Sequence, residues 1–403
     1  MTKRRTVLKS IAGAIPLGLL SRASAKPANN TKPATRDYYG ELGLKPFINA
    51  AGAYSAFGGA RMRPEVIEAM RYAATHKVKM SALHDAVGAR IAILVGSDAA
   101  MVTSGATASI VLGTAACMTL GDEEKMRQLP DTTHMKDEVI IQKRHRYTYD
   151  RSLTVAGSKL VEVESEEDVR RLVSEKTAMM FFLKPTQQGD DIPAEHYIRL
   201  AREFGIPSFC DAATTTPPAM NVVDGVSDGF DLICYSGGKG LRGPYSAGLL
   251  LGRSDLVGFA RRHAAPNDIS IGRGMKVSAE EYLGMLVALE TGLRISEADD
   301  FAYKHDRFNT IIAAVRDIPG VVTDVFVSEG HANELYLDID WDTDIIRMTP
   351  DDLARALQNH DPIVEVRAFM FSGGRIQLSA TVMDEGEEEI VGQIIRKVLL
   401  EHS

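Results

Sequence analysis

One lysine in this chain is surrounded by glycines, in a pattern that favours covalent chemistry. The stretch YSGGKGLRGPYSAGLLLG, residues 235–252, places Lys239 among four glycines and then continues into an apolar strand. Glycines permit close approach to the backbone, and a lysine amine can form a Schiff base with a carbonyl group. The same residues also fit a sharp surface turn with a solvated lysine, so the other motifs must decide.

A second motif lies where an apolar strand meets an apolar helix, in VTSGATASIVLG. Small residues at a helix N-terminus let backbone N–H groups and hydroxyls surround a phosphate, with help from the helix dipole. A plain helix cap is the alternative. The residues of this candidate cradle are Ser104, Gly105, Ala106 and Thr107.

A carboxylate ends another apolar strand, in FCDAATTTPP. Open α/β sheets bind ligands at this edge, and Pro217 and Pro218 would soon stop a helix that started at Asp211. A phosphate cradle, a strand-end carboxylate and a glycine-flanked lysine, in this order, are what pyridoxal 5'-phosphate requires. The motifs therefore predict that Lys239 forms the aldimine and moves a proton, while Asp211 keeps the pyridine nitrogen protonated.

Five further residues are candidates by position. Ser236 and Arg242 flank the lysine and are predicted to contact the phosphate, or else to shape the turn. His145, in KRHRYTYD after the strand EVIIQ, is predicted to stack on the cofactor and relay protons. Arg375 in GGRIQLS is the candidate for binding a substrate carboxylate through its guanidinium fork, and Arg273 in SIGRGMK is the competing candidate.

The elements that must position these residues alternate along the chain. Short apolar runs and amphipathic segments follow one another from about residue 99, which predicts an α/β fold with a mostly parallel sheet covered by helices on both faces. Residues 48–255 are expected to form this large cofactor-binding domain. Residues 256–403 are expected to form a smaller α+β domain, in which a capping box at Ser278 opens a long helix.

The first residues have the composition of an export signal. Residues 1–25 have a basic start, a short apolar centre and an Ala-Ser-Ala end, and the Arg4-Arg5 pair is typical of twin-arginine signals. An amphipathic tail or a short anchor is the alternative. We expect cleavage, a polar linker over residues 26–47, and a periplasmic or secreted protein that is exported folded and has no stable membrane association.

Charge and cysteine content exclude some classes. Without the five basic residues of 1–25 the formal net charge falls from −8 to −13, which argues against nucleic-acid binding. The three cysteines lie in apolar settings and predict no disulfide framework, and the histidines show no metal-ligand spacing.

The motifs together resemble a known family. SGGKGLRGP, TSGATAS, DAATTTPP and IGRGMKVSAEE are similar to the seryl-tRNA selenium transferases and D-glucosaminate-6-phosphate ammonia-lyases, which are fold type I pyridoxal phosphate enzymes. The resemblance runs from about Phe47 to the C-terminal helix and is closer to the ammonia-lyase branch. It implies a homodimer or larger homo-oligomer with sites at the subunit interface. Tyr245 departs from the polar residue typical of the family after GP, so the substrate is not carried over.

The expected function is therefore a lyase acting on a small amino-acid or amino-sugar-acid substrate, through an external aldimine and an α-carbanion. Transamination and racemisation begin from the same carbanion and remain alternatives. A tRNA-dependent selenium transferase would need a basic surface, and a non-catalytic cofactor-binding protein would not need both Lys239 and Asp211.

Overall fold

The computed structural model describes residues 36–184, 191–328, 334–368 and 374–403, in two units that comprise residues 1–45 and 46–403. In the first unit the structure describes one short helix, α1 (Tyr38–Glu41), which Asp37 caps. The predicted export signal and the linker up to residue 35 lie outside the described residues. Among the helices that are described, none has the length and hydrophobicity that crossing a bilayer requires.

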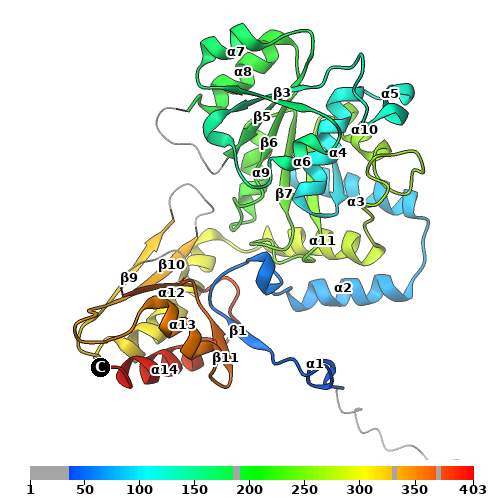
Figure 1. The fold of residues 1–403 in the computed structure, drawn as a ribbon. Coiled ribbons are helices and arrows are strands. Elements are labelled where there is room, and N and C mark those ends of the chain that lie inside the picture. Colours follow the sequence, from blue (N-terminus) through cyan, green and yellow to red (C-terminus); the bar gives the residue numbers. More distant parts are fainter. Residues whose placement is uncertain (1–35, 185–190, 329–333, 369–373) are drawn as a thin grey trace, which may run out of the picture. The chain divides into compact units, whose positions relative to one another are not determined.

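The second unit contains a seven-stranded sheet in the order β2-β8-β7-β6-β5-β3-β4 (Figure 1). Strand β8 is antiparallel to both of its neighbours, and the other pairs are parallel. This confirms the predicted mostly parallel sheet. The strands are β2 (Ala99–Thr103), β3 (Glu138–Gln142), β4 (Lys159–Val163), β5 (Thr177–Leu183), β6 (Ser208–Asp211), β7 (Leu232–Ser236) and β8 (Gly248–Gly252).

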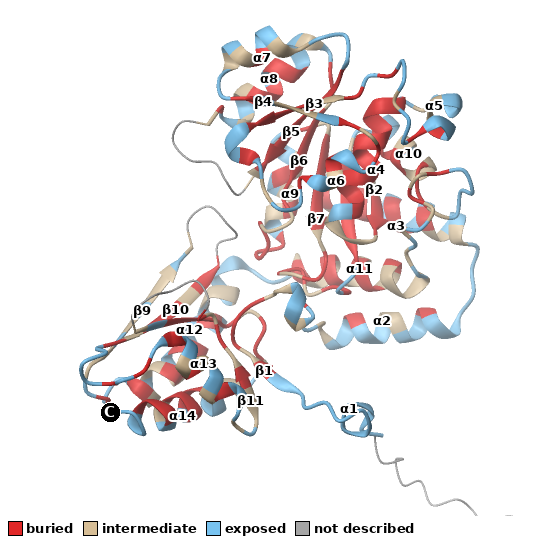
Figure 2. Ribbon diagram, viewed as in Figure 1, coloured by how far each residue is buried: buried red, intermediate tan, exposed pale blue. Residues whose placement is uncertain are grey.

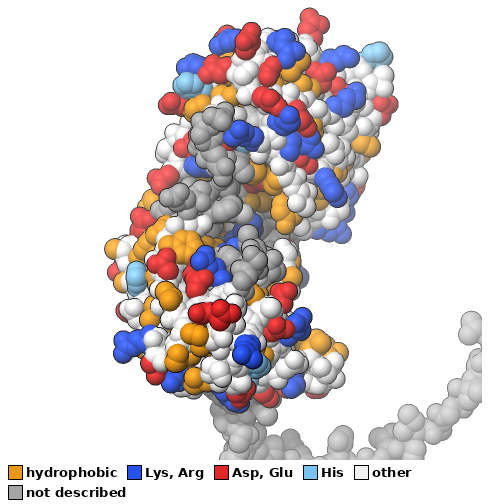
Figure 3. All heavy atoms as spheres, turned by 60° about the vertical axis from the view of Figure 1, so that its left-hand side comes forward, with side chains coloured by type: hydrophobic (Ala, Val, Ile, Leu, Met, Phe, Trp, Pro, Cys, Tyr) orange, Lys and Arg blue, Asp and Glu red, His pale blue; other side chains and the backbone are white. Residues whose placement is uncertain are grey.

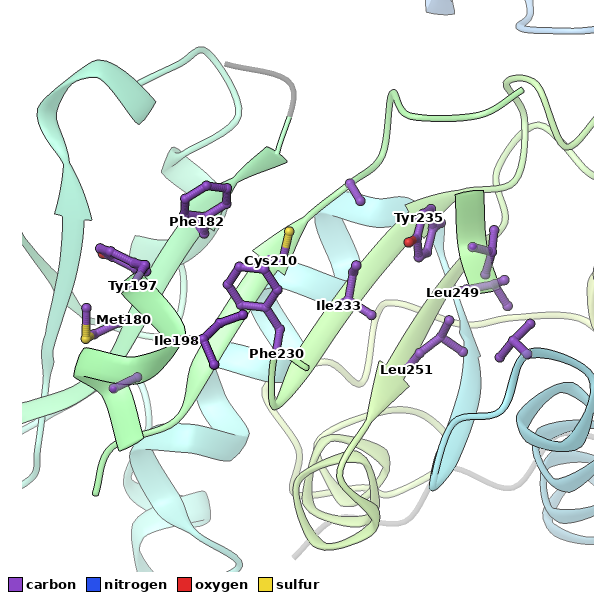
Figure 4. Packing of buried hydrophobic residues seen from close by; sticks show 14 of the residues in the cluster. Met180, Phe182, Tyr197, Ile198, Cys210, Phe230, Ile233, Tyr235, Leu249 and Leu251 are labelled. Carbon is purple, nitrogen blue, oxygen red and sulfur yellow. The ribbon is translucent and has the colours of Figure 1, made fainter. Parts of the chain in front are cut away.

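Apolar side chains cover both faces of this sheet, which explains its continuous hydrophobic runs. Along β5, Phe182 belongs to one core layer and packs 5.6 Å from the ring of Tyr197, while Phe181 belongs to the opposite layer and packs 5.8 Å from Phe209. Figure 4 shows the first layer, and Figure 2 shows the buried centre of the sheet. Such burial stabilises by about 1.5–3 kcal/mol for each large apolar side chain.

Helix α4 (Gly105–Thr119) is buried along most of its length because small residues let it approach the sheet. A Cβ added at Gly113 would lie 2.4 Å from the ring of Phe209. The other helices around this sheet are α2 (Pro64–Thr75), α3 (Met80–Val95), α5 (Glu123–Gln128), α6 (Arg151–Thr154), α7 (Glu166–Leu172), α8 (Ala194–Phe204), α9 (Met220–Ser227), α10 (Ser254–Arg262) and α11 (Ala279–Gly292), with short 3₁₀ turns at η1 (Ser55–Phe57) and η2 (Lys143–His145).

A smaller antiparallel sheet, in the order β12-β10-β9, has its own apolar core. A short parallel pair lies beside it and joins β1, from the start of the second unit, to β11 of the C-terminal part. Thr349 caps α13 through a capping box with Asp352. These elements are β1 (Phe47–Asn49), α12 (Glu297–Val315), β9 (Val321–Val327), β10 (Leu335–Trp341), α13 (Pro350–Gln358), β11 (Ile363–Glu365), β12 (Arg375–Ser379) and α14 (Glu387–Leu400).

The two apolar cores show which helices and strands pack on the large sheet and which pack on the small one. Met285 and Leu289 of α11 share the core of the large sheet, although they follow residue 255, and Ile48 of β1 shares the core of the small one. Ser278 caps α11 as predicted. The boundary at 255/256 stays a prediction, and these contacts place α10 and α11 with the large sheet.

Candidate active site

The strand register brings the predicted motifs to one edge of the large sheet. Thr103, at the end of β2, pairs with Gly248 of β8, and Gly248 pairs with Ser236 at the end of β7. Asp211, at the end of β6, pairs with Cys234 of β7. The cradle, the carboxylate and the lysine loop therefore follow neighbouring strands at the edge where such sheets bind ligands.

The lysine loop is held by its own backbone. The N–H of Gly237 donates to the carbonyl of Ala247 at 2.8 Å, and the N–H of Gly243 donates to the carbonyl of Gly237 at 2.9 Å. A Cβ added at Gly240 would lie 2.0 Å from the nitrogen of Pro217, and one at Gly238 would lie 2.7 Å from the carbonyl oxygen of Tyr245. These glycines make room for neighbouring backbone, in addition to any room they leave for a ligand.

The amine of Lys239 forms no hydrogen bond or ion pair with the residues that the structure describes. Burial lowers the pKa of Lys239, and the nearby Asp211 carboxylate opposes this shift. A partly desolvated lysine is more readily deprotonated and therefore a better nucleophile. Its chemistry fits Schiff-base formation with an aldehyde.

Asp211 is buried and receives three hydrogen bonds. The N–H of Ala213 donates to Oδ1 at 2.9 Å, the thiol of Cys234 lies 3.7 Å from Oδ1, and the phenol of Tyr147 donates to Oδ2. Burial, and then the Asp211 charge, raise the pKa of Tyr147, so this phenol keeps its proton. Tyr147 was not predicted, although it lies in the polar cluster that contains His145.

His145 is fully buried at the same edge. Its Nδ1 accepts a hydrogen bond from the N–H of Leu183 at 3.1 Å, its Nε2 lies 3.7 Å from Asp191, and its ring packs edge-on against Phe182. Burial lowers the pKa of His145 to about 4, with Asp191 opposing, so the ring is neutral at pH 7. No contact recorded for the described residues joins His145 to Asp211 or Lys239, and its catalytic and cofactor-binding roles stay predictions.

The start of α4 has the features of a phosphate cradle. Gly105 has φ +81°, a left-handed conformation that favours glycine, and the side chain of Ser104 does not cap the helix. The hydroxyl of Thr103 holds the turn by donating to the carbonyl of Gly105 at 3.0 Å. Ser104, Gly105 and Ala106 are half-buried and Thr107 is exposed, so the first N–H groups of α4 can bind an anion.

The other predicted phosphate contacts differ in their surroundings. Ser236 is half-buried at the end of β7, on the same edge as the cradle. Arg242 has φ +53°, donates from Nε to the carbonyl of Arg61 at 2.8 Å, and lies 4.0 Å from Asp384. The structure thus brings Ser236 toward the cradle and places Arg242 against residues from two other loops.

The two predicted substrate arginines contact acidic residues. Nε of Arg375 donates to Asp340 at 2.6 Å, and its guanidinium lies 3.3 Å from Asp338 on the same strand, β10. Nε of Arg273 lies 3.6 Å from Asp268. The described contacts bring neither arginine to Lys239, so both substrate roles stay predictions.

Arg367, which was not predicted, is connected to the lysine loop. Its guanidinium lies 4.8 Å from the ring centroid of Tyr336 and 6.0 Å from that of Tyr54, and it donates to the side chain of Gln377. Tyr54 begins a loop whose Ala60 N–H donates to the carbonyl of Gly238 at 2.8 Å. The sequence could have indicated Arg367 as a candidate site residue, because it follows the apolar run in PIVEVRAF.

Comparison with known proteins places this geometry among enzymes. No family model matches the chain. It is 27% identical over 377 residues to 5'-C-glycyluridine monooxygenase-decarboxylase of a Streptomyces species, covering 90% of this chain and 92% of that protein. It is 25% identical over 375 residues to D-glucosaminate-6-phosphate ammonia lyase of Salmonella typhimurium, covering 90% and 98%. A solved structure of D-glucosaminate-6-phosphate ammonia-lyase matches with a TM-score of 0.80 at 24% identity, covering 92% of this chain and 100% of that one. The predicted fold class and resemblance are confirmed.

Proposed function

We propose that this chain, a fold type I pyridoxal phosphate enzyme similar to D-glucosaminate-6-phosphate ammonia-lyase, is a lyase that eliminates a substituent from a small amino acid or amino-sugar acid. The observation that carries the proposal is the Lys239 amine, unpaired among the described residues, at the same sheet edge as the buried Asp211 and the N-terminus of α4. Each of the three supplies a different part of the required chemistry.

The roles follow from what each group can do. When bound at this edge, pyridoxal phosphate supplies an electron sink for negative charge at the substrate Cα. Lys239 would hold the cofactor covalently and, once released, take the Cα proton and return it. Asp211 would hold the proton on the pyridine nitrogen, and the first N–H groups of α4 with Ser104 would bind the phosphate.

For the substrate carboxylate we propose Arg367, with Arg375 as the alternative. Arg367 contacts Gln377 and the ring of Tyr336, and its guanidinium lies 6.0 Å from the ring centroid of Tyr54. Tyr54 begins the loop that reaches the lysine loop. A guanidinium fork in that position matches a carboxylate bidentately.

A second candidate reaction is supported by the Streptomyces relative, whose name describes a monooxygenase-decarboxylase. Loss of carbon dioxide rather than ammonia would then be the outcome at the same lysine. The two candidates can be separated by incubating the cofactor-loaded enzyme with D- and L-amino acids and amino-sugar acids, with and without oxygen. Ammonia release that is independent of oxygen is expected; oxygen-dependent release of carbon dioxide would replace the lyase proposal with the second candidate.

We also propose a homodimer that works on a small molecule outside the cytoplasm. Ile67 and Tyr72 of α2 are 50% and 56% exposed, and such apolar side chains suit a second copy of this chain. On the face shown in Figure 3, acidic and basic side chains are interspersed, and the formal net charge of the chain is −8, so neither favours a tRNA substrate. Light scattering of the purified protein would test the dimer.

A further inference from the structure

The most informative contact at the site is the one that the sequence did not predict, between Tyr147 and Asp211. Oδ2 of Asp211 accepts a hydrogen bond from the phenol, while Oδ1 accepts from the N–H of Ala213. The thiol of Cys234 is a weak donor at 3.7 Å and remains protonated, because burial raises its pKa. Tyr147 is therefore the one strong side-chain donor to this carboxylate among the described residues.

Backbone hydrogen bonds to Asp150 and packing of its ring hold Tyr147 in place. Its N–H donates to Oδ2 of Asp150 at 3.2 Å, and the Asp150 N–H donates to its carbonyl at 3.2 Å. Its ring packs against the core that covers one face of the large sheet, and it lies 6.0 Å from the ring of Tyr149 in an edge-on arrangement. The side chain is thus held at Asp211 by the surrounding fold.

We propose that Tyr147 is a positioning residue that keeps the catalytic proton on the pyridine nitrogen of the cofactor, by stabilising the charged form of Asp211. The inference rests on the proposed function, in which Asp211 faces that nitrogen. A proton shared by a carboxylate and a ring nitrogen can lie on either. A hydrogen bond donated to a carboxylate favours its charged form, so the phenol biases the proton toward nitrogen.

Keeping the proton on the pyridine nitrogen affects the cofactor ring, which accepts electrons during the reaction. The ring accepts electrons from the substrate Cα more readily when its nitrogen is protonated. The backbone N–H of Ala213 supports the same charge but approaches Oδ1, the other oxygen. Removing the phenol is therefore expected to weaken the bias without removing the carboxylate, whereas removing the carboxylate abolishes it.

The test uses the protein loaded with pyridoxal phosphate labelled with ¹⁵N in the ring, because the nitrogen chemical shift reports its protonation directly. Solid-state spectra are compared for the wild type, Tyr147→Phe, Asp211→Asn and the matched control Tyr149→Phe. Tyr149 is 55% exposed, and its phenol makes no hydrogen bond with the described residues. We expect a protonated shift in the wild type and in Tyr149→Phe, an unprotonated shift in Asp211→Asn, and an intermediate shift in Tyr147→Phe. Tyr147→Gln, which restores a donor, should recover part of the difference.

Kinetics provide a second readout. Exchange of the substrate Cα proton should slow about tenfold in Tyr147→Phe, because the ring nitrogen would be protonated less often, with little change in KM. A wild-type nitrogen shift in a folded, cofactor-loaded Tyr147→Phe would overturn the proposal. The proposal would also fail if Tyr147→Gln lost as much of the protonated nitrogen shift as Tyr147→Leu, which has no hydrogen-bond donor. If Asp211→Asn matched the wild type, or if Lys239 carried no cofactor, the proposed function itself would fail.

Discussion

Tyr147 donates a hydrogen bond to Asp211 across 64 residues of sequence and across β5, which lies between the strands that precede them. The contact joins a loop after β3 to the end of β6. Asp211 therefore lies at the centre of a polar group with Tyr147, Ala213 and Cys234 and is not an isolated charge.

Changing Asp211 to Ala should leave the cofactor bound through Lys239 and the α4 cradle, and should lower turnover at least about a hundredfold, because an unprotonated ring is a poor electron sink. The half-buried phenol of Tyr147 would lose its acceptor, at a cost of about 1 kcal/mol in the free energy of unfolding. Absorbance of bound cofactor, circular dichroism and steady-state rates are the measurements. Near-normal turnover would reduce Asp211 to a structural role.

The glycines of the lysine loop give a prediction about packing. Gly240→Ala should disturb the loop, because its Cβ would lie 2.0 Å from the nitrogen of Pro217, and overpacking of this kind costs about 1–3 kcal/mol or more. Cofactor incorporation and the melting temperature should both fall. Gly258→Ala in α10 is the matched control, since nothing lies within 4 Å of its added Cβ and alanine favours helices by about 1 kcal/mol. Equal effects of the two substitutions would contradict the loop's packing.

Arginine substitutions should separate the candidate substrate contacts. Arg367→Lys keeps the charge but loses the guanidinium fork, so KM for a free carboxylate substrate should rise about tenfold or more, with cofactor occupancy unchanged. Arg375→Lys should have little effect, because Asp338 and Asp340 already bind this exposed side chain. The reverse ranking would support the role predicted from sequence for Arg375.

His263 gives a pH dependence of stability that does not involve the site. It is fully buried, its Nε2 lies 2.9 Å from the hydroxyl of Thr119, and burial lowers its pKa from 6.5 to about 4. The unfolded chain binds a proton more tightly than the folded one, so stability is present above pH 6.5 and falls as the pH drops toward 4. By pH 5 the loss from His263 should be about 2 kcal/mol. Urea unfolding at pH 7 and pH 5 should show a smaller loss in His263→Gln than in the wild type; an identical loss would refute this.

Export can be tested separately from chemistry. Fusion of residues 1–36 to a reporter that is exported only when folded should send the reporter out of the cytoplasm. Replacing Arg4 and Arg5 with lysines should prevent this, because the twin-arginine pathway recognises the arginine pair itself. Unchanged export of the lysine variant would indicate the general secretory route.

Much of this architecture was predictable because it is local. The strands EVIIQ, TAMMFFL and DLICYS are continuous apolar runs, and the caps at Ser278 and Thr349 have short-range signatures. The order of the cradle, Asp211 and Lys239 also follows from strand ends meeting at one edge. Contacts that depend on register were not predictable, such as the pairing of Arg375 with Asp338 and Asp340 on the neighbouring strand.

The directions in which the His145 and Tyr147 side chains point could not be predicted from the sequence either. His145 and Tyr147 lie two residues apart, and the 3₁₀ turn that ends at His145 decides which of them reaches Asp211. The sequence pointed to a histidine, since histidine titrates near neutrality. The fold buries His145 against Phe182, where its Nδ1 accepts a hydrogen bond from the N–H of Leu183, and the predicted stacking and proton-relay roles stay predictions. The phenol of Tyr147 donates to Asp211, a contact that the sequence did not indicate.

The central claim, that Lys239 holds the cofactor, has a direct test. The purified protein is reduced with borohydride, digested, and mapped by mass spectrometry for the lysine that carries the pyridoxyl group. We predict one modified peptide, containing Lys239, and its absence in Lys239→Ala, while Lys304, which is buried between Asp300 and Glu334, stays unmodified. A pyridoxyl group on another lysine, or on none, would contradict the account.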